Sequence, residues 1–82
     1  MIVYNPLNLS VLKTKFKITN DVVCKITGLK TVSSITKRLN GSIPLTAYEI
    51  ALLCNYTEKR AKDDISLKPH IFSPLDFFDV VE

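Results

Sequence analysis

Hydrophobic residues along the 82-residue chain recur at intervals of three and four positions, the spacing that one face of an α-helix requires. The pattern predicts a first helix within residues 5–17 and a second within residues 19–28. Asn5 precedes Pro6, and this pair suits a helix start because a proline there needs no hydrogen-bond partner. Gly28 follows the second helix, where a left-handed residue is expected to end it.

A third helix is predicted over residues 31–40. Its hydrophobic positions, Val32, Ile35 and Leu39, form a narrow stripe that we expect to face the core. Gly41 comes just after this helix and is expected to end it. The two glycines of the chain are thus interpreted as the ends of two successive short helices.

A fourth helix is predicted to begin at a capping box, in which Thr46 and Glu49 each accept a hydrogen bond from a backbone N–H group. A fifth, more polar helix is predicted over residues 57–67 and should end before Pro69. These patterns predict an all-α fold, a compact bundle of about five short helices. We place this domain at residues 1–68.

Residues 69–82 are predicted to form a short acidic and aromatic tail. Ser73 and Pro74 suit the start of a short helix, but the residues that follow are also strand formers. Two arrangements are open for its aromatic residues. They either fold back to complete the core, against residues 2–4, or they form a dimer or partner contact.

Charge divides the chain into two unlike halves. Residues 1–41 hold seven lysine or arginine residues and one aspartate, whereas residues 42–82 hold four cations and seven acids. An anionic partner should therefore meet the first half. No stretch of the sequence is apolar for long enough to cross a membrane, and Cys24 and Cys54 are expected to be packing residues in a reducing, cytoplasmic setting.

The predicted helix 31–40 has a polar outward face without an acid. Projection at 100° per residue places Ser33, Ser34, Lys37 and Arg38 opposite the hydrophobic stripe, with Lys30 at the start of the helix. Short hydroxyl side chains and cations are the groups that contact bases and phosphates in the major groove of DNA.

The order of these features resembles the Cro/repressor-like (XRE-type) helix-turn-helix regulators of bacteria and phages. The residues that carry the resemblance are Cys24, Gly28, Leu29 and Ile35, followed by the run RLNGSIPLTAYEIALLCNY, and the similarity covers about residues 8–66. Gly28 and Ile35 are seven positions apart, one more than is commonest in that family, which predicts an enlarged turn. The glutamine usual at the start of the second helix is absent.

The resemblance implies a sequence-specific regulator of transcription, a repressor, that places helix 31–40 in the major groove of double-stranded DNA. It implies base contacts by Ser33, Ser34, Lys37 and Arg38. It implies phosphate contacts by Thr19, Asn20, Lys30, Thr31, Asn40 and Ser42. The protein would act in the cytoplasm of a bacterium or of a phage-infected cell, at the nucleoid.

A single helix-turn-helix reads few base pairs, so a homodimer is expected. The candidate dimer or partner residues are Phe72, Leu75, Phe77, Phe78 and Val81. The tail is also a candidate site for a protein antagonist. The rival hypothesis is a small phage- or mobile-element-encoded module, an inhibitor or antitoxin, that uses the same scaffold to bind a protein.

Catalysis and metal binding are not expected. The chain has no nucleophile–base pair, no phosphate-binding loop and one histidine, His70, without a surrounding ligand set. We therefore predict no enzymatic activity, no cofactor and no metal.

Overall fold

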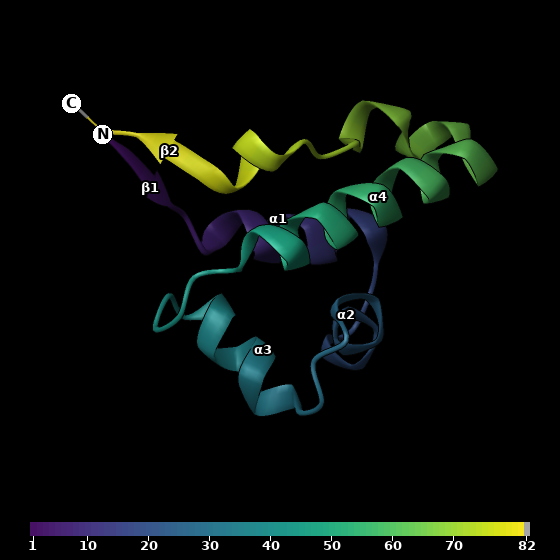
Figure 1. Cartoon of the computed structure of the whole chain (residues 1–82). Coiled ribbons are helices and arrows are strands. Elements are labelled where there is room, and N and C mark those ends of the chain that lie inside the picture. Colours follow the sequence, from purple (N-terminus) through teal and green to yellow (C-terminus); the bar gives the residue numbers. More distant parts are fainter. Residues whose placement is uncertain (82) are drawn as a thin grey trace.

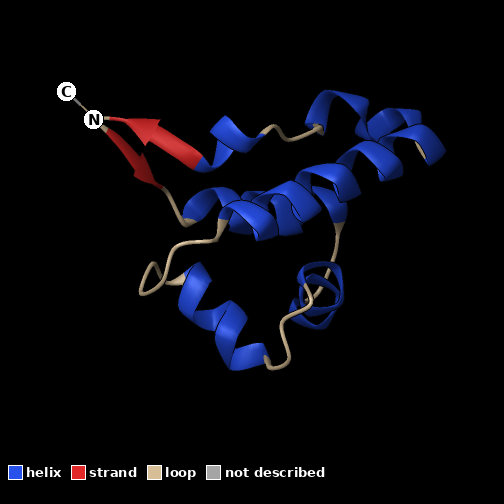
Figure 2. Cartoon of the chain, viewed as in Figure 1, coloured by secondary structure: helices blue, strands red, loops and turns tan. Residues whose placement is uncertain are grey.

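Four α-helices, two short 3-10 helices and two strands make up most of residues 1–81, the part of the chain that the computed structural model describes. Figures 1 and 2 show a mostly helical molecule with its small sheet at one end. The elements in chain order are β1 (Ile2–Tyr4), α1 (Leu7–Phe16), α2 (Asn20–Thr27), α3 (Val32–Leu39), α4 (Ala47–Asp63), the 3-10 helices η1 (Ile65–His70) and η2 (Pro74–Phe77), and β2 (Phe78–Val80).

Several of the helix starts and ends follow the predicted signals. Asn5 Oδ1 accepts a hydrogen bond from the Leu7 N–H at 3.0 Å, and Thr19 Oγ1 accepts one from the Val22 N–H at 3.4 Å. Gly28 ends α2 with φ +79°, a conformation that side chains with a Cβ atom rarely adopt. The capping box at the start of α4 is present in full.

The predicted fourth helix and the first part of the predicted fifth, residues 57–63, are one helix, α4, and the end of the predicted fifth lies in η1. Thr57 was expected to begin a new helix, but its hydroxyl donates to the Cys54 carbonyl at 2.7 Å, so the helix continues through this position. The same hydroxyl accepts the Phe72 N–H at 3.1 Å and so ties the end of the chain to α4. Pro69 was expected to lie beyond the last helix of the domain, and instead it lies inside η1.

The tail is not a separate segment, because it packs back onto the domain. Strand β2 pairs antiparallel with β1, with Ile2 opposite Val80 and Tyr4 opposite Phe78. Phe77 is completely buried. The structure therefore favours the core-completing arrangement, and the small sheet is an addition to the predicted all-α fold.

The candidate dimer residues divide accordingly. Phe77 was a wrong choice for a partner contact because no part of it reaches the surface, and Phe72 and Phe78 pack partly against the core. Leu75 and Val81 remain exposed.

The core lies between α1 and α4 and extends downward to α2 and α3 and upward to η1 and η2 (Figure 1). Its fully buried hydrophobic side chains come from all four α-helices and from η2, and they include Leu9, Leu12, Phe16, Val23, Ile35, Leu53 and Phe77. Helix α3 lies on the opposite side of the molecule from η1 and η2. Within residues 1–81, no helix has the length and apolar character needed to cross a membrane.

Candidate nucleic-acid interface

Helices α2 and α3 are joined by a four-residue turn, residues 28–31. In Figure 1, α2 is seen almost end-on while α3 lies close to the plane of the picture, so the two helices cross at a large angle. Cys24 Sγ donates to the Thr31 carbonyl at 3.5 Å across the turn. A Cβ atom on Gly28 would meet nothing within 4 Å, so the turn needs glycine for its backbone conformation and not for space.

The buried side of α3 differs from the predicted stripe. Ile35 is fully buried and Leu39 is half-buried, but Val32 is 43% exposed. Arg38 is only 9% exposed and takes the inward position expected for Val32. Around the helix axis, Val32 and Arg38 lie about 60° from Ile35 on opposite sides. Whichever of these two residues faces the core together with Ile35 therefore determines the rotation of α3 about its axis.

Arg38 forms a buried ion pair with Glu49 of α4. Its Nε donates to Glu49 Oε1 at 2.9 Å and its Nη2 donates to Oε2 at 3.1 Å, a two-point contact. Its Nη1 donates to the Ser34 carbonyl at 3.0 Å, and the Tyr4 hydroxyl donates to the Arg38 carbonyl at 3.1 Å. The predicted base contact of Arg38 is therefore wrong, because its guanidinium is used to fix α3 against α4.

Glu49 serves two structural contacts at once. Burial raises the pKa of this carboxyl, but the hydrogen bond from Arg38 and the backbone N–H of Thr46, at 3.0 Å, outweigh burial and lower the pKa below its ordinary value. The carboxylate thus stays ionised at neutral pH. The sequence contained one indication of this pair. Glu49 lies four positions before Leu53, which is buried, so the two residues lie on the same face of α4.

The exposed face of α3 consists of Val32, Ser33, Thr36 and Lys37, and it contains no carboxylate. Ser33 and Lys37 therefore lie where the prediction put them, whereas Ser34 is half-buried at the edge. Val32 and Thr36 were missed, because the projection was oriented toward Val32 as a core residue. The Thr36 hydroxyl donates to the Val32 carbonyl at 3.2 Å, so it can only accept hydrogen bonds from a ligand.

A row of hydroxyl groups marks the start of α3. Thr31 Oγ1 lies 3.1 Å from Ser33 Oγ and 3.0 Å from Ser34 Oγ. Lys30 and Thr31 are both exposed beside it. At the other end of α3, Asn40 Oδ1 accepts the Ser42 N–H at 2.9 Å, and both residues are exposed. The phosphate candidates of this region thus lie at the two ends of one helix.

The start of α2 suits an anion less well. Thr19 is exposed and its hydroxyl caps the helix, while Asn20 Oδ1 accepts a hydrogen bond from Lys13 Nζ. Asp21 is exposed directly beside them. Because this carboxylate would repel a phosphate, the cationic start of α3 is the stronger candidate.

Among residues 1–81, no three histidine, cysteine, aspartate or glutamate side chains are grouped so that they would hold a metal ion. Both cysteines are free. Burial, with smaller effects of Asp76 and Glu58, raises the pKa of the Cys54 thiol to about 11, so this thiol remains protonated at neutral pH. Cys54 therefore behaves as a packing residue.

Comparison of the chain with models of protein families, with curated proteins and with solved structures finds no match.

Proposed function

We propose that this protein binds double-stranded DNA through α3, with α2, the turn and α3 acting as a helix-turn-helix, and that it represses transcription in the cytoplasm without catalysing a reaction. The observation that carries the proposal is the exposed face of α3. Ser33, Thr36 and Lys37 offer hydrogen-bonding and positively charged groups, and Val32 offers a methyl surface for thymine. No acid interrupts this face.

The surroundings of α3 support the same use. Lys30 and Thr31 at its start and Asn40 and Ser42 at its end are exposed and would meet phosphates on either side of the groove. The Arg38–Glu49 pair holds the inner face of α3, so the helix is presented in a fixed orientation. A rigid reading helix loses less entropy on binding than a mobile one.

A homodimer would use the end of the small sheet. Tyr4 and Phe78 pack against the core, and on the same face of the sheet Ile2 and Val80 continue outward with exposures of 61% and 76%. A second copy covering these two side chains would bury the exposed part of this apolar face. If the wild type is a dimer, Val80→Lys should be a monomer when its mass is measured by size exclusion coupled to light scattering. A Val80→Lys variant that keeps the dimer mass would contradict this interface.

The DNA proposal is tested by measuring affinity for a selected duplex and for a scrambled one over a range of salt. Lys37→Ala should reduce the preference for the selected duplex by about 1–3 kcal/mol. Lys30→Ala should weaken binding to both duplexes alike and flatten the salt slope by roughly one unit. Lys62→Ala, which removes an exposed cation of α4, is the matched control. Equal effects of all three variants would contradict a specific role for α3.

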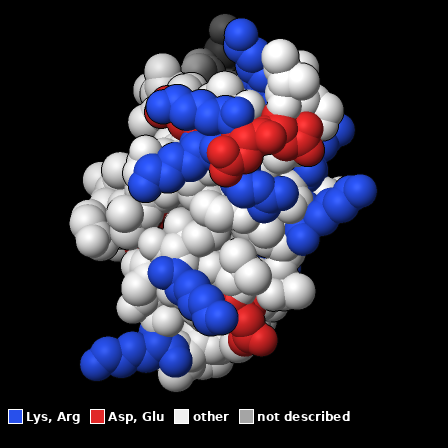
Figure 3. Space-filling model, turned by 90° about the vertical axis from the view of Figure 1, so that its right-hand side faces the viewer, with Lys and Arg blue, Asp and Glu red and all other residues white. Residues whose placement is uncertain are grey.

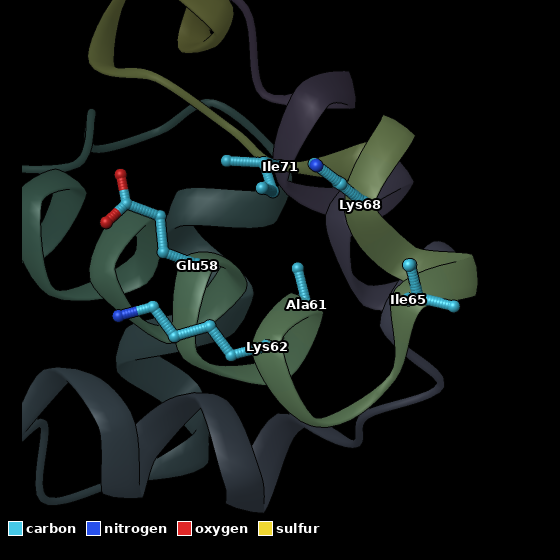
Figure 4. Close-up of a pocket in the computed structure, with 6 residues that line it drawn as sticks. All are labelled: Glu58, Ala61, Lys62, Ile65, Lys68 and Ile71. Atoms are coloured by element: carbon cyan, nitrogen blue, oxygen red, sulfur yellow. The ribbon is translucent and has the colours of Figure 1, made fainter.

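The rival function, binding of a target protein or antagonist, is favoured by a groove of about 430 Å³ between α4 and η1. Figure 4 shows Ala61 between Ile65 and Ile71, with the charged side chains of the groove around them. Ile65 is 80% exposed. Deletion of the tail does not test this role, because it would remove Phe77 from the core.

Ile65→Asp separates the two functions, because it alters the groove without removing a core residue. Loss of a partner's binding with DNA affinity unchanged supports the protein-binding module. The absence of DNA binding by the wild type at low salt would remove the repressor proposal.

A further inference from the structure

A second cationic region lies away from α3, where the ends of α1 and α4 meet η1. A pocket of about 260 Å³ opens there, and the side chains that line it include Lys15, Lys17, Arg60, Asp64, Ser66 and His70. Figure 3 shows the side of the molecule on which α4 ends, with many Lys and Arg side chains and fewer Asp and Glu side chains. Three permanent cations thus share one pocket with a single carboxylate.

The single carboxylate of this pocket offsets only part of the charge of the three cations. Asp64 Oδ1 accepts hydrogen bonds from the Ser66 N–H at 3.0 Å and the Ser66 hydroxyl at 2.6 Å, and so it caps η1. In residues 1–81 the one ion pair is that of Arg38 with Glu49. Lys15, Lys17 and Arg60 therefore have no ion-pair partner in this part of the chain. Neighbouring cations repel each other, and an anion placed between them would remove that repulsion.

Arg60 is held in place by its neighbours. Its Nη1 donates to the Tyr56 hydroxyl at 2.6 Å, and its guanidinium carbon lies 5.6 Å from the centre of the Tyr56 ring and 6.0 Å from that of Phe16. Its other N–H donors have no hydrogen-bond acceptor among residues 1–81. A positioned guanidinium with free donors is the usual partner of a phosphate oxygen.

Lys17 occupies a backbone position that disfavours lysine. It ends α1 with φ +54°, and it is the one residue other than glycine with positive φ in the described chain. Glycine or asparagine is the common choice at such a helix end, because other residues are strained there. The exposed Lys17 side chain thus lines the pocket although its left-handed backbone conformation is unfavourable for lysine.

We propose that this pocket binds a phosphate monoester, with Lys15, Lys17 and Arg60 contacting the dianion. The charge and the donors fit a group with two negative charges and three terminal oxygens. The ligand is either a small phosphorylated molecule or a terminal phosphate of a nucleic acid. The site lies across the molecule from α3 and does not depend on DNA binding by that helix.

The test is an amide NMR titration of the full chain with ribose 5-phosphate and, separately, with short duplexes with and without a 5′-phosphate. Saturable shifts at Lys17, Ser66 and His70 at millimolar ribose 5-phosphate are expected for a small ligand. Shifts of these residues only with the 5′-phosphorylated duplex would assign the source to nucleic acid. The proposal is overturned if neither probe causes saturable shifts there.

The matched variants remove two cations each. Lys15→Gln with Lys17→Asn should weaken the binding at least tenfold and still fold, because asparagine accepts the left-handed conformation. Lys25→Gln with Lys59→Gln, a pair of exposed lysines outside both this pocket and α3, should leave it unchanged. Equal weakening by both pairs would overturn the site and leave only a general attraction of anions. Binding of an unphosphorylated duplex that the Lys15 and Lys17 pair leaves unchanged keeps the two proposals separate.

Discussion

Replacement of Arg38 by methionine separates the two roles that this residue can have. Methionine retains an unbranched side chain of similar length but leaves the Glu49 carboxylate without its cation. The side chains of Arg38 and Glu49 are 11% and 7% exposed, so the unpaired charge would remain largely buried. Breaking a buried pair typically costs about 3–5 kcal/mol. Because Glu49 keeps its hydrogen bonds with Thr46, we expect a loss of about 2–4 kcal/mol in the free energy of unfolding.

This loss would be large for a domain of 82 residues. Domains of this size unfold with a free energy of roughly 4–12 kcal/mol, and each kcal/mol shifts the melting temperature by about 4–8 °C. We therefore expect Arg38→Met to melt roughly 10–25 °C below the wild type. Circular dichroism during urea and thermal unfolding measures both quantities.

Lys37→Met is the matched control, because it removes the neighbouring cation of the same helix from an exposed position. Its free energy of unfolding should change by no more than about 0.5 kcal/mol. Glu49→Gln should cost less in the Arg38→Met background than in the wild type, since the two residues are coupled. If Arg38→Met is as stable as Lys37→Met, the buried pair is refuted and Arg38 returns to the set of candidate base contacts.

Three further results are expected. Phe77→Ala should lower the free energy of unfolding by about 3–5 kcal/mol because Phe77 is fully buried, whereas Leu75→Ala should lower it by less than about 1 kcal/mol because Leu75 is exposed. If urea unfolding shows similar losses for the two variants, the described packing of the tail is contradicted. The pKa of Glu49 in the folded protein is below its ordinary value of 4.5, so the ionised carboxylate stabilises the fold above that pH, and this contribution is lost as pH falls through the folded pKa. Glu49→Gln should therefore lose less stability than the wild type when unfolding is measured at decreasing pH. An equal loss of stability in the two proteins would exclude this carboxyl as the cause. Iodoacetamide at pH 8 should modify half-buried Cys24 before buried Cys54, whose thiol has a pKa of about 11, and faster modification of Cys54 by mass spectrometry would contradict its burial.

Local signals in the sequence predicted several helix boundaries well. Thr19, Gly28 and the Thr46–Glu49 box act through residues within four positions, so their effect can be read from the sequence without knowledge of the fold. The long helix α4 was divided in error because the residues from Thr57 onward are more polar than those before them. The Thr57 hydroxyl bonds within the helix and to Phe72, and the second partner is 15 positions away.

The errors at the candidate site have the same origin. The orientation of α3 depends on whether Val32 or Arg38 shares the inner side with Ile35, and hydrophobicity alone favours Val32. Arg38 is buried because Glu49, 11 positions away, provides a carboxylate at the required place. The pairing of β1 with β2 joins the two ends of the chain, and three-residue strands leave too short a pattern to predict.

Selection from a pool of random DNA duplexes tests the central proposal most directly. The folded wild-type chain, retained with bound duplexes at low salt, should enrich a defined sequence, and Lys37→Ala should enrich it less strongly. A pool that remains random after repeated rounds, with the wild type folded throughout, would contradict the proposal that α3 reads DNA.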